Sequence, residues 1–393
     1  FTRQYAGEVI GSVNIVLMAC SLVIATRPKW AEPYFGGLDQ MYITHRHTST
    51  AALLLIFVHV LTVPISLEGW VLGNYLAVIA FTGIVSLALV SLAPRVPFLN
   101  NITGGTYDGW KKLKRYIGIF FILGFIHSLT IGHPLNAFIA INWVQIFFII
   151  GASAYLYTEI LGRYFGKYLP YKVESIDHPN YITTEVTLRA TDNPIKKHRA
   201  GQFLFVHFPN AGTLNESHPF TISSAPQEDV LRVTVKASGD FTRTLFNDLK
   251  AESDAIVEGP YGMFDYKTGG DKQIWIAGGI GLTPFLSFIR DMNGDLNHDV
   301  EFYYTVRHRD EALFYNELVE KAQQNPRLKL HIRFSATGGS LTVEEIVRDA
   351  GGNIDGYHVY MCGPYPMIQA FKKKFLTLGV PSNHIHFEEF SFR

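Results

Sequence analysis

Histidines stand at both ends of the stretch from His45 to His59, and most of the residues between them are apolar. Fourteen steps along an α-helix turn through about 1400°, about 40° short of full turns, and rise about 21 Å. On one helix the two imidazoles would therefore lie on nearly the same face, at two depths. Histidine inside a membrane helix predicts a function, and imidazole nitrogen is a ligand that haem iron takes.

A second apolar stretch, YIGIFFILGFIHSL, carries His127 near its end. If both stretches cross a membrane in the same direction, His59 and His127 face each other at one depth, toward the outer side, as the axial ligands of a b-type haem would. An inner haem opposite His45 would need a histidine where Leu113 and Lys114 stand. Three accounts of the inner site stay open: Lys114 binds iron, His45 holds a five-coordinate haem, or no haem binds. We favour a surface position for Lys114, and so one haem, with two as the alternative.

The composition divides the chain into two halves. Charged residues are scarce from Gly7 to about Leu161, whereas the rest is typical of a soluble α/β protein. The formal net charge of 0 gives no electrostatic reason to expect nucleic acid, and the two cysteines, one in each half, exclude a disulfide framework. Apolar stretches of the roughly 20 residues that a membrane helix needs occur at 8–26, 42–66, 71–93, 116–133 and 137–160.

Lysine and arginine indicate the orientation of these spans. Basic residues flank the connections near 27–46 and 95–115 and follow the last span, whereas the turns near 67–70 and 133–137 have none. The positive-inside rule then puts the second half in the cytoplasm. We expect a multi-pass protein of the plasma (cytoplasmic) membrane, embedded in the lipid bilayer, with one further helix upstream of Phe1.

The second half predicts two folded domains. Short alternating strands from about 170 to 265, with one helix-like stretch, predict a small antiparallel β-barrel. From 272 onward strands and helices alternate, which predicts a doubly wound parallel sheet. The predicted domains are a helical membrane domain over 1–165, a barrel over 166–267 and an α/β domain over 268–393.

A glycine-rich turn, AGGIGLTP, follows the first strand of the α/β domain, from Ala277 to Pro284. Glycines let the backbone approach a pyrophosphate, and the following helix N-terminus favours its negative charge. The second strand ends at Arg307, where arginine would accommodate an adenosine 2′-phosphate and an acidic residue would instead hold a 2′-hydroxyl. We therefore predict NADPH as the dinucleotide, with NADH as the alternative.

Taken together, these features resemble the ferric reductase and NADPH oxidase superfamily, most closely the bacterial NADPH oxidases, over essentially the whole chain. Two segments of the barrel resemble the flavin motifs of that family, namely His218-Pro219-Phe220-Thr221 and Ser238-Gly239-Asp240-Phe241-Thr242. The resemblance implies that Phe220 lies along the isoalloxazine of FAD, Thr221 near its reactive edge and His218 near the pyrophosphate. The sequence departs from the family at Lys114, which stands in place of the inner histidine.

Three more segments resemble the nicotinamide nucleotide motifs of the family. They are Glu258-Gly259-Pro260-Tyr261-Gly262, the turn with Gly278, Gly279, Gly281, Thr283 and Pro284, and Met361-Cys362-Gly363-Pro364. The family keeps an aromatic side chain over the flavin near its C-terminus, which Phe390 matches best and Phe392 next best. The catalytic residues implied are Thr221, Cys362 and Phe390.

The resemblance implies a transmembrane haem bundle joined to a ferredoxin-NADP reductase-like module. Its activity would pass electrons from cytosolic NADPH through FAD and b-type haem to oxygen outside, giving superoxide. Alternatives are a transmembrane ferric-chelate reductase, an electron donor to an extracytoplasmic partner protein, and a cytoplasmic flavin reductase with a membrane anchor. No calcium-binding loop is evident in the sequence, so we expect activity without an obligatory activator.

Overall fold

The computed structural model describes residues 2–64, 69–92, 113–131, 138–162, 168–195, 197–292 and 297–388. The chain divides into two compact units. The first comprises Phe1–Ala31 and Gln40–Gly166, and the second comprises Glu32–Asp39 and Lys167–Arg393. The short segment Glu32–Asp39, which contains helix α2 (Glu32–Phe35), thus folds with the second unit although its chain neighbours belong to the first.

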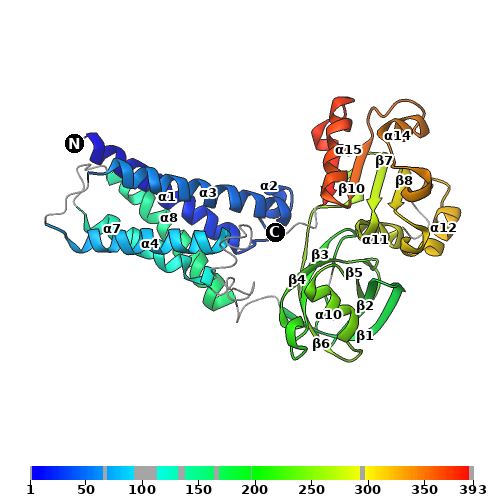
Figure 1. Ribbon diagram of the computed structural model, residues 1–393, viewed down its shortest axis with the longest axis horizontal. Coiled ribbons are helices and arrows are strands. Elements are labelled where there is room, and N and C mark those ends of the chain that lie inside the picture. Colours follow the sequence, from blue (N-terminus) through cyan, green and yellow to red (C-terminus); the bar gives the residue numbers. More distant parts are fainter. Residues whose placement is uncertain are drawn as a thin grey trace. The chain divides into compact units, whose positions relative to one another are not determined.

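The first unit is helical. Its helices are α1 (Thr2–Ala25), α3 (Leu38–Thr62), α4 (Leu72–Leu92), η2 (Lys114–Tyr116), α7 (Ile117–Thr130), α8 (Phe138–Leu156) and η3 (Tyr157–Leu161). Helix α1 packs on α8, and α4 packs on α7 (Figure 1). Gly151 permits the first of these contacts, because a Cβ there would lie 2.9 Å from the Ala19 Cα.

Three helices among the described residues are long and apolar enough to cross a membrane: Thr2–Ala25, Leu72–Ser91 and Asn142–Leu161. They overlap three of the five spans predicted from the sequence, those at 8–26, 71–93 and 137–160. The other two predicted spans overlap α3, which carries the polar stretch around His45, and α7, which has only 14 described residues. The turn at 133–137 and most of the basic connection near 95–115 lie outside the described residues.

The second unit begins with an antiparallel barrel. Its strands are β1 (Tyr168–Asn180), β2 (Thr183–Ala190), β3 (Phe203–His207), β4 (His218–Thr221), β5 (Leu231–Lys236) and β6 (Asp254–Tyr261). They pair in the order β4-β3-β6-β1-β2-β5, and an antiparallel bridge from Ile222 to Val233 joins the two end strands. Strand β6 alternates buried and partly exposed residues, as a barrel wall with one apolar face must. Helix α10 (Asp240–Asp248) follows β5, and the short η4 (Gly212–Asn215) precedes β4.

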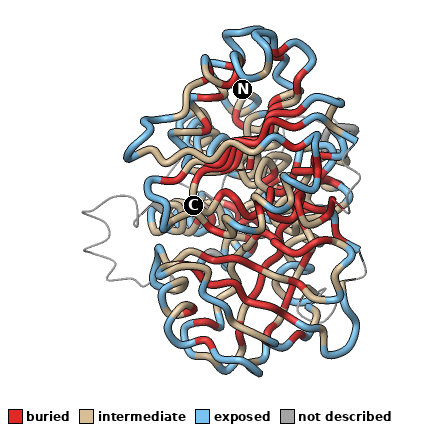
Figure 2. The backbone as a smooth tube through the Cα atoms, turned by 90° about the vertical axis from the view of Figure 1, so that its right-hand side faces the viewer, coloured by how far each residue is buried: buried red, intermediate tan, exposed pale blue. Residues whose placement is uncertain are grey.

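A parallel sheet completes the unit. Its strands are β7 (Lys272–Gly278), β8 (Asp299–Val306), β9 (Leu328–Phe334), β10 (His358–Cys362) and β11 (Ile385–Glu388), in the order β11-β10-β7-β8-β9. The helices between them are α11 (Thr283–Asp291), α12 (Tyr315–Gln324), α13 (Ser335–Gly338), α14 (Val343–Asp349) and α15 (Tyr365–Thr377). Aromatic side chains such as Trp275 and Phe288 fill the core on one face, and aliphatic ones such as Ile276 the core on the other. Figure 2 shows buried backbone running through the strands, with exposed backbone around them.

The predicted barrel followed by a doubly wound parallel sheet is confirmed. Two local differences have simple causes. The helix expected to open at Leu282 begins at Thr283, because a 3₁₀ turn, η6 (Gly279–Leu282), precedes it. Helix α13 is a single turn too short to leave a periodic pattern in the sequence.

Candidate active site

The glycine turn and the Met361–Pro364 segment meet at the carboxyl edge of the parallel sheet. Strands β7 and β10 are neighbours, and the strand order runs outward from them in both directions, which makes their shared edge the topological switch point. A Cβ on Gly281 would collide with the backbone carbonyl of Cys362. Gly279 adopts a φ of +55°, which favours glycine. In open α/β sheets this crevice is where ligands bind.

Helix α11 points its first turn at the same crevice. Thr283 and Pro284 are buried at its start, and the Thr283 hydroxyl donates to the Ile280 carbonyl at 3.1 Å. The proline lacks an N–H that would have no helical partner there in any case, and its φ suits the first turn. The helix dipole and the backbone N–H groups of the first turn make this end suitable for a pyrophosphate.

Cys362 and Glu388 lie side by side where β10 and β11 end. They are paired in the strand register, and both are buried, at 0% and 5% exposure. Burial, and after it the Glu388 carboxyl, raise the pKa of the Cys362 thiol, so the thiol stays protonated. Burial, and after it Asp39, raise the pKa of Glu388 well above its usual value. Glu388 Oε2 has no hydrogen-bond partner among the described residues.

Sequence reasoning did not identify Glu388. The sequence HIHFEEF shows a strand with two successive acids near the chain end, and no periodicity separates a buried acid from an exposed one there. Only the pairing of β11 with β10 brings its carboxyl to the Cys362 thiol. Phe390 and Phe392, predicted to cover the flavin, lie outside the described residues.

The first flavin motif forms β4 and lines one side of the barrel. Thr221 is 4% exposed, and its Oγ1 is buried with no hydrogen-bond partner among the described residues. A buried hydroxyl without a partner costs about 1–3 kcal/mol, so this atom fits a site where a bound group supplies the missing hydrogen bond. Phe220 and Pro219 beside it are partly exposed, which leaves apolar surface for a planar ring.

The second flavin motif begins helix α10. The N–H groups of Ser238 and Gly239 donate to the Thr242 hydroxyl, at 3.0 and 2.9 Å, so two of the donors expected to meet phosphate are already used. The Phe241 ring lies 3.9 Å from the His218 ring and 6.2 Å from the Phe220 ring, between centroids. The two motifs therefore form one aromatic wall, although they are separate in sequence.

The Glu258–Gly262 segment contains the end of strand β6, which lies between β3 and β1 in the barrel. Gly259 has a φ of +149°, and a Cβ there would lie 3.2 Å from the Leu204 Cα. The N–H of Gly262 donates to Glu32 Oε1 at 3.0 Å, in a buried contact. Glu32 comes from helix α2, far away in the chain, and no local pattern predicts the contact.

Two arginines follow strand β8 at the same carboxyl edge of the sheet. Arg307 and Arg309 are both exposed, and the Arg309 guanidinium lies over the Tyr315 ring, 5.4 Å from its centroid. Cationic side chains with few neighbours here leave room for an anionic group of a dinucleotide.

In the helical unit, the histidines are held in one orientation by backbone carbonyls. His59 Nδ1 donates to the Gly7 carbonyl at 2.8 Å and His127 Nδ1 to the Gly73 carbonyl at 2.9 Å, because a carbonyl can only accept. The proton on Nδ1 leaves Nε2 as the basic nitrogen, which is the arrangement of metal-binding histidines. The two ring centroids are 6.4 Å apart with an interplanar angle of 80°.

These distances suit two imidazoles on one iron. Two metal–nitrogen bonds of about 2 Å, plus about 1 Å from each nitrogen to its ring centre, put the centroids about 6 Å apart. His45 is also oriented by a backbone carbonyl, since its Nδ1 lies 3.0 Å from the Ser21 carbonyl oxygen and 2.9 Å from the Ser21 hydroxyl. The side chain of Lys114 is outside what the structure describes.

Comparison with known proteins identifies the second unit. Residues 170–265 match the FAD-binding domain family, and residues 275–373 match the oxidoreductase NAD-binding domain family. The chain carries an FAD- and NAD(P)-binding oxidoreductase module. This reductase module contains the crevice, both flavin motifs and all three nicotinamide motifs described above.

Relatives of the reductase module serve several kinds of electron transfer. The carnitine monooxygenase reductase subunit of Escherichia coli K12 is 28% identical over 211 residues, which are 52% of this chain and 63% of the relative. NADPH oxidase 1 of Mus musculus is 26% identical over 215 residues, which are 50% of this chain and 34% of the relative. The chain thus spans less than two thirds of the length of these curated relatives.

A solved flavohemoglobin from Malassezia yamatoensis, with bound FAD and heme, aligns with 99% of this chain and 98% of its own, with a TM-score of 0.56 and 17% identity. At that identity the likeness concerns the fold alone.

Proposed function

We propose that this protein is a membrane-bound NADPH oxidase that takes electrons from cytosolic NADPH and reduces oxygen on the outer side to superoxide. The overall reaction oxidises one NADPH to NADP⁺ and H⁺ and reduces two O₂ by one electron each. The observation that carries the proposal is the His59–His127 pair, joined in one chain to a reductase module. A reductase without a membrane role has no need of two carbonyl-held histidines that face each other between apolar helices.

Separate sets of residues in the reductase module would bind FAD and NADPH. Thr221 and the wall of His218, Phe220 and Phe241 hold FAD, with Thr221 Oγ1 aimed at its reactive edge. The turn Gly278–Pro284 holds the NADPH pyrophosphate, and Gly363 and Pro364 close the crevice around it. Bound FAD would take a hydride, two electrons and one proton, and release the electrons singly, and bound haem would carry them one at a time.

Cys362 and Glu388 would face the nicotinamide. Burial raises the pKa of both groups, which opposes their ionisation and so limits negative charge where a nicotinamide would approach a flavin. Phe390 is proposed as the aromatic residue that yields its place to the nicotinamide. Arg307 would pair with the 2′-phosphate, which favours NADPH over NADH.

His59 and His127 would hold the haem through their Nε2 atoms, and His45 is the candidate ligand of a second, inner haem. Helices α1 and α4 would orient the two ligands, because the Gly7 carbonyl accepts from His59 Nδ1 and the Gly73 carbonyl accepts from His127 Nδ1. The bilayer would be crossed by α1, α3, α4, α7 and α8, and the distribution of Lys and Arg supports a reductase module in the cytoplasm, at the plasma membrane.

Haem quantitation against FAD in purified protein tests the proposal. We expect wild-type protein and His47→Ala to show the same Soret band, since His47 is exposed on the same helix as His59. His127→Ala should lose most of the band while its FAD content stays unchanged. An unchanged band in His127→Ala would remove the proposed ligand pair, and two haems per FAD would assign the second to His45.

The acceptor is tested separately. We expect NADPH oxidation in air with superoxide formation, and little NADPH oxidation under anaerobic conditions with a ferric chelate. The opposite result would make the protein a transmembrane ferric-chelate reductase. Oxidation that needs an added protein acceptor would favour a role like that of the monooxygenase reductase subunits among its relatives.

A further inference from the structure

We propose that Arg290 is a positioning residue for NADPH oxidation. It fastens the helix that starts at the glycine turn to the flavin barrel, and so fixes the nicotinamide end of the crevice relative to the flavin end. The inference rests on the proposed use of FAD and NADPH by the reductase module. It concerns a residue outside both flavin motifs and all three nicotinamide motifs.

The Arg290 guanidinium joins the two domains of the reductase module. Its Nη1 donates to Glu185 Oε1 at 2.9 Å and to the Ser223 carbonyl at 3.0 Å, both in the barrel. Its Nε and Nη2 donate to the two carboxylate oxygens of Glu317 in α12, at 2.7 and 2.9 Å. The side chain is only 8% exposed, and it lies over the Phe314 ring. Buried, forked contacts of this kind hold geometry far better than exposed ion pairs do.

In the barrel, the Ser223 carbonyl that accepts from Arg290 lies only two residues after Thr221 of the first flavin motif. Ser223 follows Thr221 closely, and its hydroxyl accepts from Thr234 Oγ1 at 3.0 Å. Glu185 lies within hydrogen-bonding distance of the Ser223 and Thr234 hydroxyls as well as of Arg290. A movement of the guanidinium therefore moves the backbone that carries Thr221.

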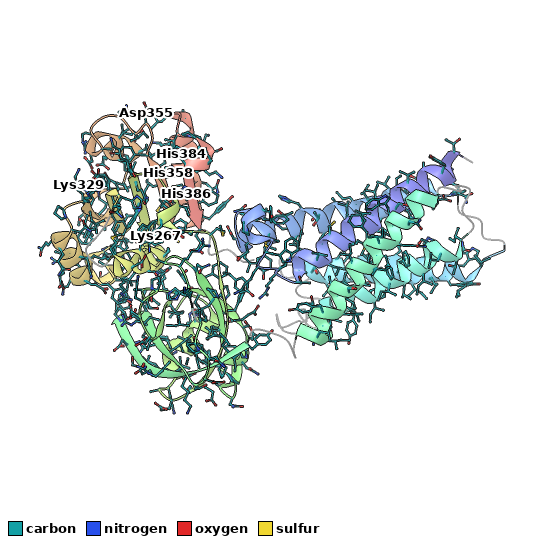
Figure 3. All side chains as sticks on the ribbon, turned by 180° about the vertical axis from the view of Figure 1, so that it is seen from behind. Lys267, Lys329, Asp355, His358, His384 and His386 are labelled. Carbon is teal, nitrogen blue, oxygen red and sulfur yellow. The ribbon has the colours of Figure 1, made fainter. Side chains whose placement is uncertain are left out.

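Two more contacts fasten helix α11 to the segment that follows Thr221. The Ser287 hydroxyl donates to the Ser224 carbonyl at 2.7 Å. Asp291 is 5% exposed and accepts from Gln227 Nε2 at 2.6 Å, and it also binds Lys267 Nζ at 2.6 Å. Figure 3 shows Lys267 where the barrel meets the parallel sheet.

The helix between these fixed points acts as a rigid spacer. Thr283 begins α11 at the dinucleotide crevice, and Arg290 lies in its last turn. Seven helical residues span about 10 Å. Because the barrel holds the C-terminal turn of α11, its N-terminal turn is fixed relative to Thr221. That turn therefore fixes the position of bound NADPH relative to Thr221.

Arginine is needed because one side chain must serve acceptors in three elements at once. Lysine would keep the charge but could not bond Glu317 with two parallel donors and also reach Glu185. A misplacement of about 1 Å between reacting atoms can slow a reaction about 100-fold. Binding of the dinucleotide phosphates, which depends on the turn itself, should change little.

The test compares Arg290→Lys with Arg189→Lys in the full chain with FAD bound. Arg189 is a matched control, because its Nη2 donates to Glu174 at 2.7 Å within the barrel alone. Anaerobic stopped-flow spectroscopy measures flavin reduction per bound FAD over a range of NADPH concentrations. Hydrogen–deuterium exchange without nucleotide follows the amides of Ile222 and Ser223, which bond to the Gln202 and Arg232 carbonyls.

We expect Arg290→Lys to slow flavin reduction at saturating NADPH about 10- to 100-fold, with the NADPH concentration at half-maximal rate within about twofold of wild type. Exchange at the two amides should rise in Arg290→Lys and stay unchanged in Arg189→Lys. An unchanged rate per bound FAD, even with lower FAD content or a lower melting temperature, would overturn the positioning role and leave a structural one. A wild-type flavin that NADPH does not reduce would instead refute the proposed function, and this role with it.

Discussion

Replacing Thr221 with valine should stabilise the flavin-free protein and weaken its affinity for FAD. Valine keeps the shape of threonine and removes the buried hydroxyl, whose oxygen has no partner among the described residues. Leaving such a group unpaired costs about 1–3 kcal/mol, so Thr221→Val should raise the free energy of unfolding of the apoprotein by about that amount. For a module of this size, each kcal/mol raises the melting temperature by about 2–4 °C.

The same hydroxyl should gain its hydrogen bond when FAD binds. In wild type this bond removes the cost of the unpaired hydroxyl, whereas Thr221→Val has no such cost to remove. The variant therefore gains less free energy than wild type when FAD binds, and its affinity for FAD is lower. A change of about 1–3 kcal/mol corresponds to a Kd for FAD about 5- to 150-fold higher.

The assay measures thermal unfolding of the flavin-free protein and a fluorescence titration with FAD. Thr234→Val is the matched control, because Thr234 is equally buried at 4% exposure but its hydroxyl donates to Ser223. That variant should lower the melting temperature of the apoprotein. If Thr221→Val also lowers it, or leaves the Kd for FAD unchanged, then Thr221 Oγ1 does not point at the flavin and the reasoning fails.

Three further predictions follow from the crevice. Gly281→Ala should abolish NADPH-dependent flavin reduction while FAD stays bound, because the new methyl group meets the Cys362 carbonyl; stopped-flow reduction checks it. Arg307→Ser should raise the KM for NADPH about 10- to 150-fold and leave that for NADH unchanged, since a charged hydrogen bond contributes about 1.5–3 kcal/mol. Folding raises the pKa of Glu388, so the protonated carboxyl stabilises the protein fully below the pKa of the unfolded state. This stabilisation is lost as pH rises toward the pKa of the folded state. Glu388→Gln should therefore remove this pH dependence from melting temperatures measured over a pH series.

The strands and helices of the reductase module were predictable because their signals are local. Alternating apolar residues in β6, a buried run in β7 and the glycine turn after it each depend on neighbours within about ten residues. The turn residues followed from the same logic: Gly279 needs its positive φ, and Gly281 needs the absence of a side chain. Thr221 and Cys362 could be proposed as site residues because they lie within segments that resemble known motifs.

The rest of the site depends on contacts between distant parts of the chain. The sequence around Arg290 is that of an ordinary amphipathic helix, and arginine there predicts a solvated side chain. Its burial follows only from its contacts with Glu185 in β2 and Glu317 in α12, which are distant in the sequence. Glu388 was missed for a similar reason, because the register of β11 on β10, and no property of β11 itself, sets its carboxyl against Cys362.

The contact of Glu32 with Gly262 joins the two most distant positions of the chain among these examples. Its carboxylate is 6% exposed and accepts the Gly262 N–H, 230 positions away in the chain, so the turn that ends β6 is completed by a residue that precedes His45. Without that oxygen the buried N–H would lack a partner, at a cost of about 1–3 kcal/mol. The predicted boundary at 165/166 separates the two residues, whereas their contacts put Glu32–Asp39 in the same compact unit as the barrel. The turn at the end of β6 therefore keeps this hydrogen bond only in a chain that retains Glu32.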